Sequence, residues 1–385
     1  MLKRRIYEEE HEMFRRTVRA WAEKHVFPHV EQWREDGIVS RDVWRAAGAE
    51  GFLCMYADEK YGGLGIDDFR YDMILSEEIG PREPGLFIPL HNRIVGPYLQ
   101  KFATDAQRDR YMPGVVSGGT ILAIAMTEPG TGSDLAAIRT KAEDKGDHWL
   151  LNGAKTYISN GHLAGLVVVA ARTDPDSTHG IGLFLVDGDA EGFTRGRNLK
   201  KLGLHSQDTA ELFFTDVKLP KDALIGPAAG GFKLMMTNLA EERIMGAVGY
   251  LAHAERAFDL TMDYIMDRRA FGRAIGTFQN SRFKMADMRT KLDAAWALTD
   301  HCVREHLEGT LSAEMAAEAK LLTSEVEGYV ADECLQLHGG AGFMDEYEVS
   351  RIFADARISR IYAGSSEIMK EIIGRGLGLD ERKRN

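Results

Sequence analysis

The run Ile-Leu-Ala-Ile-Ala-Met-Thr-Glu-Pro-Gly-Thr-Gly-Ser-Asp, residues 121–134, marks the place where the character of the chain changes. Its first part, 121–126, is a short apolar run that is typical of a buried strand. Its second part contains Pro129-Gly130 and a further glycine, Gly132, and this composition predicts a tight loop. The loop suits a β-hairpin closure, and it equally suits a site where a planar ligand approaches the backbone, because glycine has no side-chain bulk.

Upstream of this run, residues 1–120 show the apolar spacing of amphipathic helices. Phe14, Val18 and Trp21 recur at helical spacing in the first helix, which ends before a proline. Ser40 is a typical N-cap for the second helix. Helices are predicted at residues 8–25, 40–47, 69–79, 92–102 and 105–116. We therefore expect an N-terminal α-helical domain over residues 1–120.

Downstream of the run, short β-rich segments alternate with turn signals. The turn signals are Asn152-Gly153, Asn160-Gly161 and Asp187-Gly188. Strands are predicted at residues 121–126, 149–151, 156–158, 165–170, 181–186 and 211–217. Because no helical pattern separates these strands, they favour a small barrel or sandwich over βαβ units. We therefore expect a middle β-barrel domain over residues 121–227.

The last part of the chain, residues 228–385, contains no proline. Long stretches with helical apolar periodicity are predicted as four helices, at residues 231–268, 278–308, 312–337 and 348–376. Four such helices are enough for an antiparallel bundle. The expected fold is an α+β multidomain protein in which a helical domain, a β domain and a four-helix bundle follow one another.

The composition narrows the classes of function. The chain has 385 residues and a formal net charge of −11, which argues against nucleic acid and anionic membranes as main partners. No run approaches the ~18 apolar residues of a transmembrane helix, and no secretory signal is visible. We therefore expect a bacterial cytoplasmic location, or the mitochondrial matrix for a trimmed eukaryotic protein. Three widely spaced cysteines without CxxC spacing predict neither a disulfide framework nor a metal site.

Further motifs accompany the loop at 125–134. The segment 156–161, Thr-Tyr-Ile-Ser-Asn-Gly, is by itself typical of a strand that ends in a hairpin turn. In the helical zone, a lone Arg-Arg pair is typical of a solvated helix face, and a lone histidine is typical of a satisfied core residue. The helical-zone segments are Arg268-Arg269-Ala270-Phe271-Gly272, Phe278-Gln279, Gln336-Leu337-His338-Gly339-Gly340 and Ile361-Tyr362-Ala363-Gly364-Ser365-Ser366-Glu367-Ile368. Chance would rarely produce all of them in this order.

With these motifs in this order, the whole chain resembles the acyl-CoA dehydrogenase family, most closely its long-chain type. The long-chain resemblance rests on residues 124–128, 210–214 and 368–371. The family fold agrees with the three zones described above. The resemblance implies an oxidoreductase of fatty acid β-oxidation with FAD as cofactor, an acyl-CoA as substrate and electron-transferring flavoprotein as electron acceptor. It also implies a homotetramer in which a neighbouring subunit helps to hold the FAD pyrophosphate.

The resemblance assigns site residues motif by motif. The contacts of the flavin part are Ile124, Ala125, Met126, Thr127, Gly132, Ser133, Tyr157, Ile158, Ser159, Ser365, Ser366 and Glu367. The contacts of the FAD pyrophosphate and adenosine are Arg268, Gln279, Gln336, Leu337, His338, Gly339 and Gly340. The acyl-CoA contacts are Ser133, Thr178, His179, Lys233, Glu242, Arg243, Ala363 and Gly364. No metal ligand is implied.

The catalytic base is the point at which this sequence departs from most of the family. Desaturation of the thioester removes a proton from the α-carbon while the β-carbon delivers hydride to flavin N5, so a base is required. In most members a glutamate follows the tyrosine of the last motif, but here that position is Ala363, which cannot accept a proton. Long-chain and isovaleryl types have instead a glutamate directly before an arginine on an earlier helix, and Glu242 matches that position. Its neighbour Glu241 points roughly 100° away and is expected on an acidic helix face.

Three alternatives stay open at the level of sequence. An acyl-CoA oxidase or a flavin monooxygenase of the same fold would reoxidise its flavin with oxygen. A catalytically dead scaffold protein would keep the fold, and Ala363 is the residue that supports this alternative. The length and branching of the acyl group also stay open, because long-chain and branched-chain types both have a glutamate at the position of Glu242.

Overall fold

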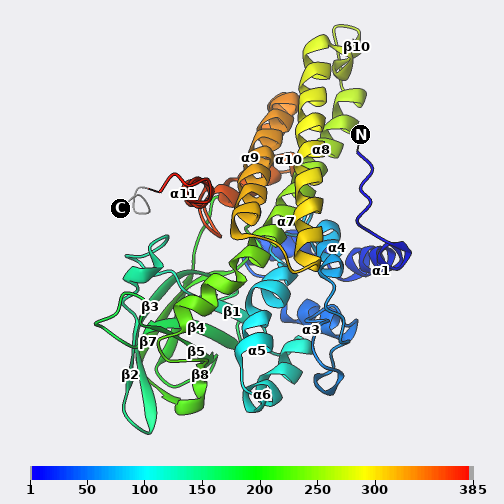
Figure 1. Cartoon of the computed structure of the whole chain (residues 1–385). Helices are drawn as coiled ribbons and strands as arrows, with labels where there is room; N and C mark the ends of the chain where they lie inside the picture. The colour runs from blue at the N-terminus through cyan, green and yellow to red at the C-terminus, as the bar shows by residue number, and fades with distance from the viewer. Residues whose placement is uncertain (1, 381–385) are drawn as a thin grey trace.

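A computed structural model describes residues 2–380, and in it helices precede and follow a large β zone (Figure 1). The N-terminal helices are α1 (Glu9–His25), α2 (Val30–Asp36), α3 (Arg41–Ala49), α4 (Phe69–Ile79), a π-helical turn (Leu90–Val95), α5 (Gly96–Phe102) and α6 (Asp105–Val116). Ser40 caps α3 by accepting a hydrogen bond from the Asp42 amide, as its position predicts. The prediction of a helix at 92–102 is confirmed, although its first turn is π-helical.

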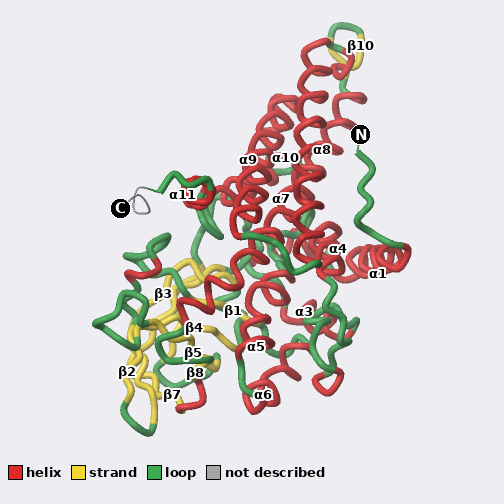
Figure 2. Tube along the Cα trace, in the orientation of Figure 1, coloured by secondary structure: helices red, strands yellow, loops and turns green. Residues whose placement is uncertain are grey.

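The β zone contains β1 (Leu122–Ala125), β2 (Lys141–Asp144), β3 (His148–Ser159), β4 (Leu166–Arg172), β5 (Ile181–Asp187), β6 (Phe193–Asn198), β7 (Thr209–Pro220) and β8 (Leu224–Ile225). They form one sheet in the order β6-β7-β3-β2-β4-β5-β8, with β1 paired in parallel to β4. In Figure 2 the strands occupy a single block below the helices of the bundle. The sheet curls over, because Trp149 of β3 and Phe184 of β5 meet with ring centroids 5.3 Å apart although two strands lie between theirs.

Strand β4 shows how the sheet is placed between two cores. Leu166, Val168 and Ala170 point toward a core that they share with the N-terminal helices. Val167 and Val169 alternate with them and point into the interior of the curled sheet. Both faces of β4 are buried, which explains why its sequence is a continuous apolar run.

The prediction of a turn at Asn152-Gly153 is wrong, since these residues lie inside strand β3. The register between β3 and β7 shifts between Leu151 and Gly153, so the pair forms a bulge instead of a hairpin. A Cβ at Gly153 would lie 2.5 Å from the Thr140 hydroxyl oxygen, so the glycine is required by close packing. The two predicted strands 149–151 and 156–158 are therefore one long strand.

The C-terminal zone contains α7 (Gly231–Asp267), α8 (Gln279–Leu307), α9 (Ala313–His338), α10 (Glu348–Ala356) and α11 (Ser366–Gly376). A hairpin of β9 (Arg269–Ala270) and β10 (Arg273–Ala274) connects α7 to α8. The 3-10 turns of the chain are Phe27–His29, Glu59–Tyr61, Leu135–Ala137, Lys221–Ala223, Ile275–Thr277, Gly339–Phe343 and Arg357–Arg360.

The prediction of one helix over 348–376 is wrong, because α10 and α11 are separate. The break contains Ala363 and Gly364, whose φ angles of +52° and +91° are incompatible with a right-handed helix. Ser365 then starts α11 by accepting a hydrogen bond from the Ile368 amide. The interruption falls on the motif that the resemblance assigns to flavin and substrate.

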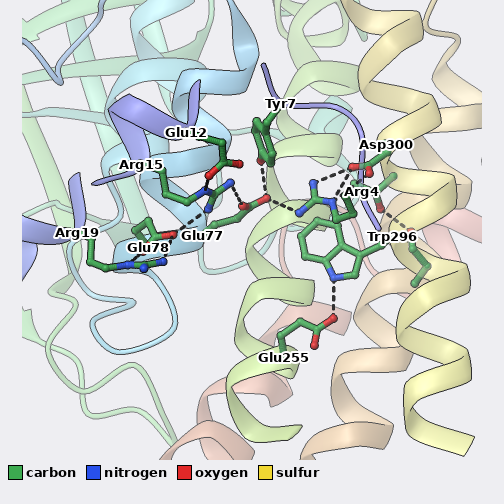
Figure 3. Close-up of polar contacts among 12 residues, drawn as sticks. Arg4, Tyr7, Glu12, Arg15, Arg19, Glu77, Glu78, Glu255, Trp296 and Asp300 are labelled. Carbon is green, nitrogen blue, oxygen red and sulfur yellow. Dashed lines mark hydrogen bonds and ion pairs between the residues drawn. The ribbon is translucent and has the colours of Figure 1, made fainter. Parts of the chain in front are cut away.

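The N-terminal segment ties the helical domain to the bundle (Figure 3). The Arg4 guanidinium donates to Glu77 on α4 and to Asp300 on α8, both at 2.7 Å. It also stacks on the Trp296 ring with its central carbon 3.6 Å from the ring centroid. A single side chain near the start of the chain thus connects α4 and α8, whose paired acids lie 73 and 296 residues further along the sequence.

The three cysteines are free thiols with buried side chains. Cys54 lies in the core between the N-terminal helices and the sheet, whereas Cys302 and Cys334 lie in the core of the bundle. Burial raises the pKa of each thiol, to about 12 for Cys54 and Cys334 and to about 11 for Cys302. Within residues 2–380, no helix is long and apolar enough to cross a membrane.

Candidate active site

Glu242 is a buried acid of α7, with 7% of its surface exposed. Its Oε1 accepts one hydrogen bond of 3.2 Å from the Asn238 amide one turn earlier. Burial raises the pKa of Glu242 to about 7, although Asn238 and the charge of Arg243 act in the opposite direction. A carboxylate with a pKa near neutrality is suited to accept a proton at physiological pH.

Glu241 has a different environment, and the expectation that it lies on an acidic helix face is wrong, because it is buried against cations of another domain. Its side chain is buried and forms ion pairs with Arg93 at 3.4 Å and with Lys101 at 3.0 Å. Both cations belong to the N-terminal helical domain. Glu241 therefore holds α7 against that domain, whereas Glu242 forms no direct ion pair with any residue in the range 2–380.

The loop between α10 and α11 is fixed by a buried lysine of α9. The Lys320 ammonium donates to the Ser359 carbonyl at 2.7 Å and to the Gly364 carbonyl at 2.6 Å. Burial lowers the pKa of Lys320 to about 8, and the nearby charge of Arg243 acts in the same direction. In the same loop, the Tyr362 ring packs near Tyr250 of α7 with centroids 5.9 Å apart. The loop that carries Ala363 and Gly364 is thus brought against the helix that carries Glu242.

Two backbone amides of this loop are available for a ligand. The amides of Ala363 and Gly364 donate no hydrogen bond to any residue in the range 2–380. Arg243, next to the predicted base, is also buried, and its Nε has no hydrogen-bond acceptor in that range. Unpaired donors around a buried carboxylate are typical of a site that is completed by an acceptor from a ligand.

The predicted flavin loops are joined by an ion pair inside the sheet. Lys155 donates to Glu128 at 2.9 Å and to the Met126 carbonyl at 3.0 Å. The Glu128 carboxylate also accepts the amides of Arg139 and Thr140 at 2.7 and 2.8 Å. The strand that carries 157–159 is therefore fixed to the loop that carries 126–133.

These two loops have the surface that a planar cofactor requires. Tyr157 is 69% exposed and has a φ angle of +59°, an unusual conformation for a residue with a side chain. No atom lies within 4 Å of the Cβ position of Gly130 or Gly132. Ser159 is half-buried beside them, and its hydroxyl donates to Gln207 at 3.4 Å. Exposed aromatic surface, a hydroxyl and open glycine backbone fit the isoalloxazine of FAD, as the sequence predicts.

A second pair of loops forms the predicted CoA side. Arg172, at the end of β4, donates to the carbonyls of Ala136 at 2.6 Å and Ser177 at 2.7 Å. It thereby holds the loop after Ser133 against the loop that carries Thr178 and His179. The His179 ring packs on Phe232 at the start of α7, with centroids 4.6 Å apart, and Lys233 follows with an exposed side chain. Arg172 was not predicted, because an arginine at a strand end has no distinctive sequence signal.

Within one copy of the chain, the residues predicted to contact the FAD adenosine and pyrophosphate lie far from the predicted flavin loops. Arg268 and Gln279 are exposed on either side of the β9–β10 hairpin. Figure 1 shows this hairpin at the end of the bundle opposite to the sheet. The His338 ring stacks on Tyr264 of α7 with centroids 4.2 Å apart, so the Gln336–Gly340 segment also lies at that end.

The remaining predicted residues lie at the start of α11. Ser365 caps the helix, and the Ser366 hydroxyl is buried and donates to Glu325 at 2.8 Å. Glu367 is exposed, and its hydrogen bond with Ser365 lowers its pKa. Ser366 therefore has a structural partner, whereas Glu367 is free to meet a ligand at the surface.

Comparison with known proteins gives consistent matches along the chain. Family models match in order: the acyl-CoA dehydrogenase N-terminal domain over residues 8–119, its middle domain over 123–217 and its C-terminal domain over 229–378. The mitochondrial long-chain specific acyl-CoA dehydrogenase of Mus musculus is 41% identical over 98% of this chain and 88% of its own length.

Solved structures agree with the sequence matches. An acyl-CoA dehydrogenase from Geobacillus kaustophilus is 44% identical, with a TM-score of 0.96 over 97% of this chain and 100% of that chain. A glutaryl-CoA dehydrogenase from Mycobacterium smegmatis, solved in complex with FADH2, is 28% identical, with a TM-score of 0.89 over 97% and 96% of the two chains. Because domain order, fold and sequence agree over nearly its full length, the chain belongs to the acyl-CoA dehydrogenase family.

Proposed function

We propose that Glu242 removes the α-proton of a fatty acyl-CoA while the Cα–Cβ bond is oxidised to the trans-2-enoyl thioester. The chain is an FAD-dependent acyl-CoA dehydrogenase, and nothing in the comparisons favours an oxidase, a monooxygenase or a dead scaffold. The observation that carries the proposal is the environment of Glu242: it is buried, lacks a direct ion pair and has a pKa of about 7. Ala363 supplies no carboxylate at the alternative position.

Each side chain has a separate role in this proposal. Glu242 accepts the proton, and its burial keeps water away from the carboxylate. The unpaired amides of Ala363 and Gly364 bind the thioester oxygen and acidify the α-carbon. The amide of Glu242 itself lies inside α7, where the preceding turn already accepts it, so it is less suited to this task. When bound, FAD accepts the hydride that leaves the β-carbon.

The separation of the two halves of the FAD site supports an oligomer. The isoalloxazine loops lie on the sheet, whereas Arg268, Gln279 and the Gln336–Gly340 segment lie at the far end of the bundle. We infer that a second copy supplies the adenosine half, in a homotetramer. The same proposal includes four further points. The chain is of the long-chain subfamily, and electron-transferring flavoprotein accepts its electrons. It is located in the cytoplasm or the mitochondrial matrix, and its domains divide at residues 120 and 227.

A pair of neighbouring substitutions tests the assignment of the base. Glu242→Gln keeps size and its hydrogen bond to Asn238, and we expect it to lower kcat at least ~1000-fold while FAD and acyl-CoA still bind. Glu241→Gln is the matched control, and we expect it to keep turnover within about tenfold while lowering the Tm. Turnover is measured by reduction of an artificial dye acceptor. An active Glu242→Gln together with an inactive Glu241→Gln would show that the wrong carboxylate has been assigned.

A further inference from the structure

One face of α7 leads from Glu242 into the interior of the protein. Gly246, Gly249 and His253 follow Glu242 at intervals of four, seven and eleven residues, which places all four residues on one side of the helix. Neighbouring side chains pack closely against both glycines: a Cβ at Gly246 would lie 2.9 Å from the Tyr250 hydroxyl oxygen, and one at Gly249 would lie 3.3 Å from the Ser76 hydroxyl oxygen, so the glycines keep this side of α7 narrow. It points toward a cavity of about 70 Å³ that both glycines and His253 line.

The far end of this cavity contains a polar pair instead of apolar side chains. His253 and Glu327 of α9 are both buried, and Nδ1 of the imidazole lies 2.9 Å from Oε1 of the carboxylate. Among residues 2–380, the second oxygen of Glu327 has no hydrogen-bond donor, and the Ser359 hydroxyl near this carboxylate donates to the Ala356 carbonyl. A buried carboxylate oxygen without a donor is an energetic cost that a ligand hydroxyl would remove.

A second cavity continues beyond this pair. It has a volume of about 240 Å³ and shares Pro84, His253 and Asp355 with the first cavity. Glu83 lines it as well, and this buried side chain also has an oxygen, Oε2, that has no hydrogen-bond donor in the described part of the chain. A chain that follows α7 from Glu242 therefore meets hydrogen-bonding groups at His253 and has room beyond them.

The charges around the pair favour a neutral group over an anion. Glu327, Asp355 and Glu83 line the two cavities together with His253, so acids outnumber the imidazole. The arginines of the outer cavity are already paired: Arg82 with Glu23, Arg34 with Asp345 and Arg351 with Glu31. A carboxylate at the end of the acyl chain would be repelled, whereas a hydroxyl can accept from His253 and donate to Glu327.

We propose that His253 and Glu327 bind a hydroxyl group on the distal part of the acyl chain, so that hydroxylated long-chain acyl-CoAs are the preferred substrate class. This inference rests on the proposed function, in which Glu242 acts at the α-carbon. Eleven helical residues between Glu242 and His253 correspond to about 16 Å. An extended carbon chain advances ~1.2 Å per bond, so the hydroxyl is expected at about carbon 14.

The test compares three chain ends at each chain length from about 10 to 16 carbons: methyl, hydroxymethyl and carboxylate. For the wild-type holoenzyme we expect kcat/KM for the terminal hydroxyl to exceed that for the methyl end about tenfold near 14 carbons, with little preference at 10. The double variant His253→Leu/Glu327→Leu removes both polar groups together and should lose or reverse this preference. Glu318→Leu, an exposed change on the same helix, is the control.

The outcomes separate the two proposals. Activity on methyl-ended chains without a hydroxyl preference overturns the assignment of the pair and leaves Glu242 as base intact. A preference for the carboxylate end overturns it as well. Inactivity of the wild type on every acyl-CoA would overturn the proposed function itself. If the double variant does not fold, the wild-type series decides alone.

Discussion

Glu241 and Glu242 are adjacent in sequence, yet α7 gives them opposite electrostatic environments. Glu241 faces Arg93 and Lys101 of the N-terminal domain, and Glu242 faces the interior with one amide as its neighbour. Of the two carboxylates, Glu241 forms direct ion pairs with cations among residues 2–380, and Glu242 does not. The free-energy cost of ionising the carboxylate is therefore higher for Glu242 than for Glu241.

The pKa of Glu242 sets a pH dependence for the reaction. Burial raises this pKa to about 7, so the ionised form that can accept a proton exists mainly above neutrality. We expect kcat/KM to rise roughly tenfold per pH unit below pH ~7 and to level off above it. A pH–rate profile of the wild-type enzyme checks this, and Glu241→Gln should move the midpoint to lower pH, because the charge of Glu241 helps to raise the pKa of Glu242. A midpoint near the ordinary glutamate value of ~4.3 would contradict the assignment.

Single residues also mark the limit of what sequence can predict. The position of Glu242 and the loss of the carboxylate at Ala363 are visible in the sequence. The roles of Lys155 and Lys320 are not, because each is defined by the backbone carbonyls that it reaches across the fold. A lysine buried in this way has no local pattern that separates it from a lysine at the surface.

At the scale of elements, several helices were predicted within a residue or two, as for α4, α6 and α8. Strands were predicted where they are apolar, and β2, β6 and the two-residue β8 were missed because they are short or polar. The fourth predicted helix was wrong at its centre, where φ at Ala363 is positive. The apolar periodicity of this segment predicts a continuous helix, but a continuous helix would not present the loop to α7.

Lys320 of α9 holds the loop between α10 and α11 in place. Lys320→Met removes its two hydrogen bonds to the Ser359 and Gly364 carbonyls. We expect the free energy of unfolding to fall by about 2–4 kcal/mol and kcat to fall 10–100-fold, with a smaller change in KM. Stopped-flow turnover and chemical denaturation check this against the exposed control Lys291→Met. An unchanged kcat would show that the loop is positioned by its other contacts.

The N-terminal segment is a second anchor, and its contribution depends on pH. Burial would raise the pKa of Glu77, but the charges of Arg4 and Arg15 lower it. A lowered pKa stabilises the fold above the ordinary glutamate value, and this stabilisation is lost as the pH falls through the lowered value. We expect Arg4→Met to lower the free energy of unfolding by about 3 kcal/mol at pH 7 and by less near pH 3.

Thermal or urea denaturation at the two pH values measures this difference. Arg45→Met removes an exposed ion pair on α3 and should change stability by less than about 1 kcal/mol. A loss for Arg4→Met that is equal at both pH values would assign the effect to packing on Trp296 instead of charge.

At the scale of the whole molecule, the split FAD site predicts complementation between subunits. Arg268→Ala damages the adenosine half, and Glu242→Gln removes the base beside the flavin half. When the two inactive proteins are unfolded together and reassembled, hybrid sites contain one intact half from each chain. With equal amounts of the two variants, we expect about a quarter of all sites to combine the two intact halves and activity to return accordingly. Each variant reassembled alone is the control, and a mixture that stays inactive would place both halves in one chain.

The three buried cysteine thiols can report where the folded protein opens locally. Cys54 reports on the seam between the first helices and the sheet, whereas Cys302 and Cys334 report on the bundle. A thiol reagent reacts with the thiolate, so labelling in the native state has to wait until a core opens and the pKa returns to its ordinary value. Labelling rates followed separately at the three positions would show which core of this enzyme unfolds locally most often, without any engineered probe.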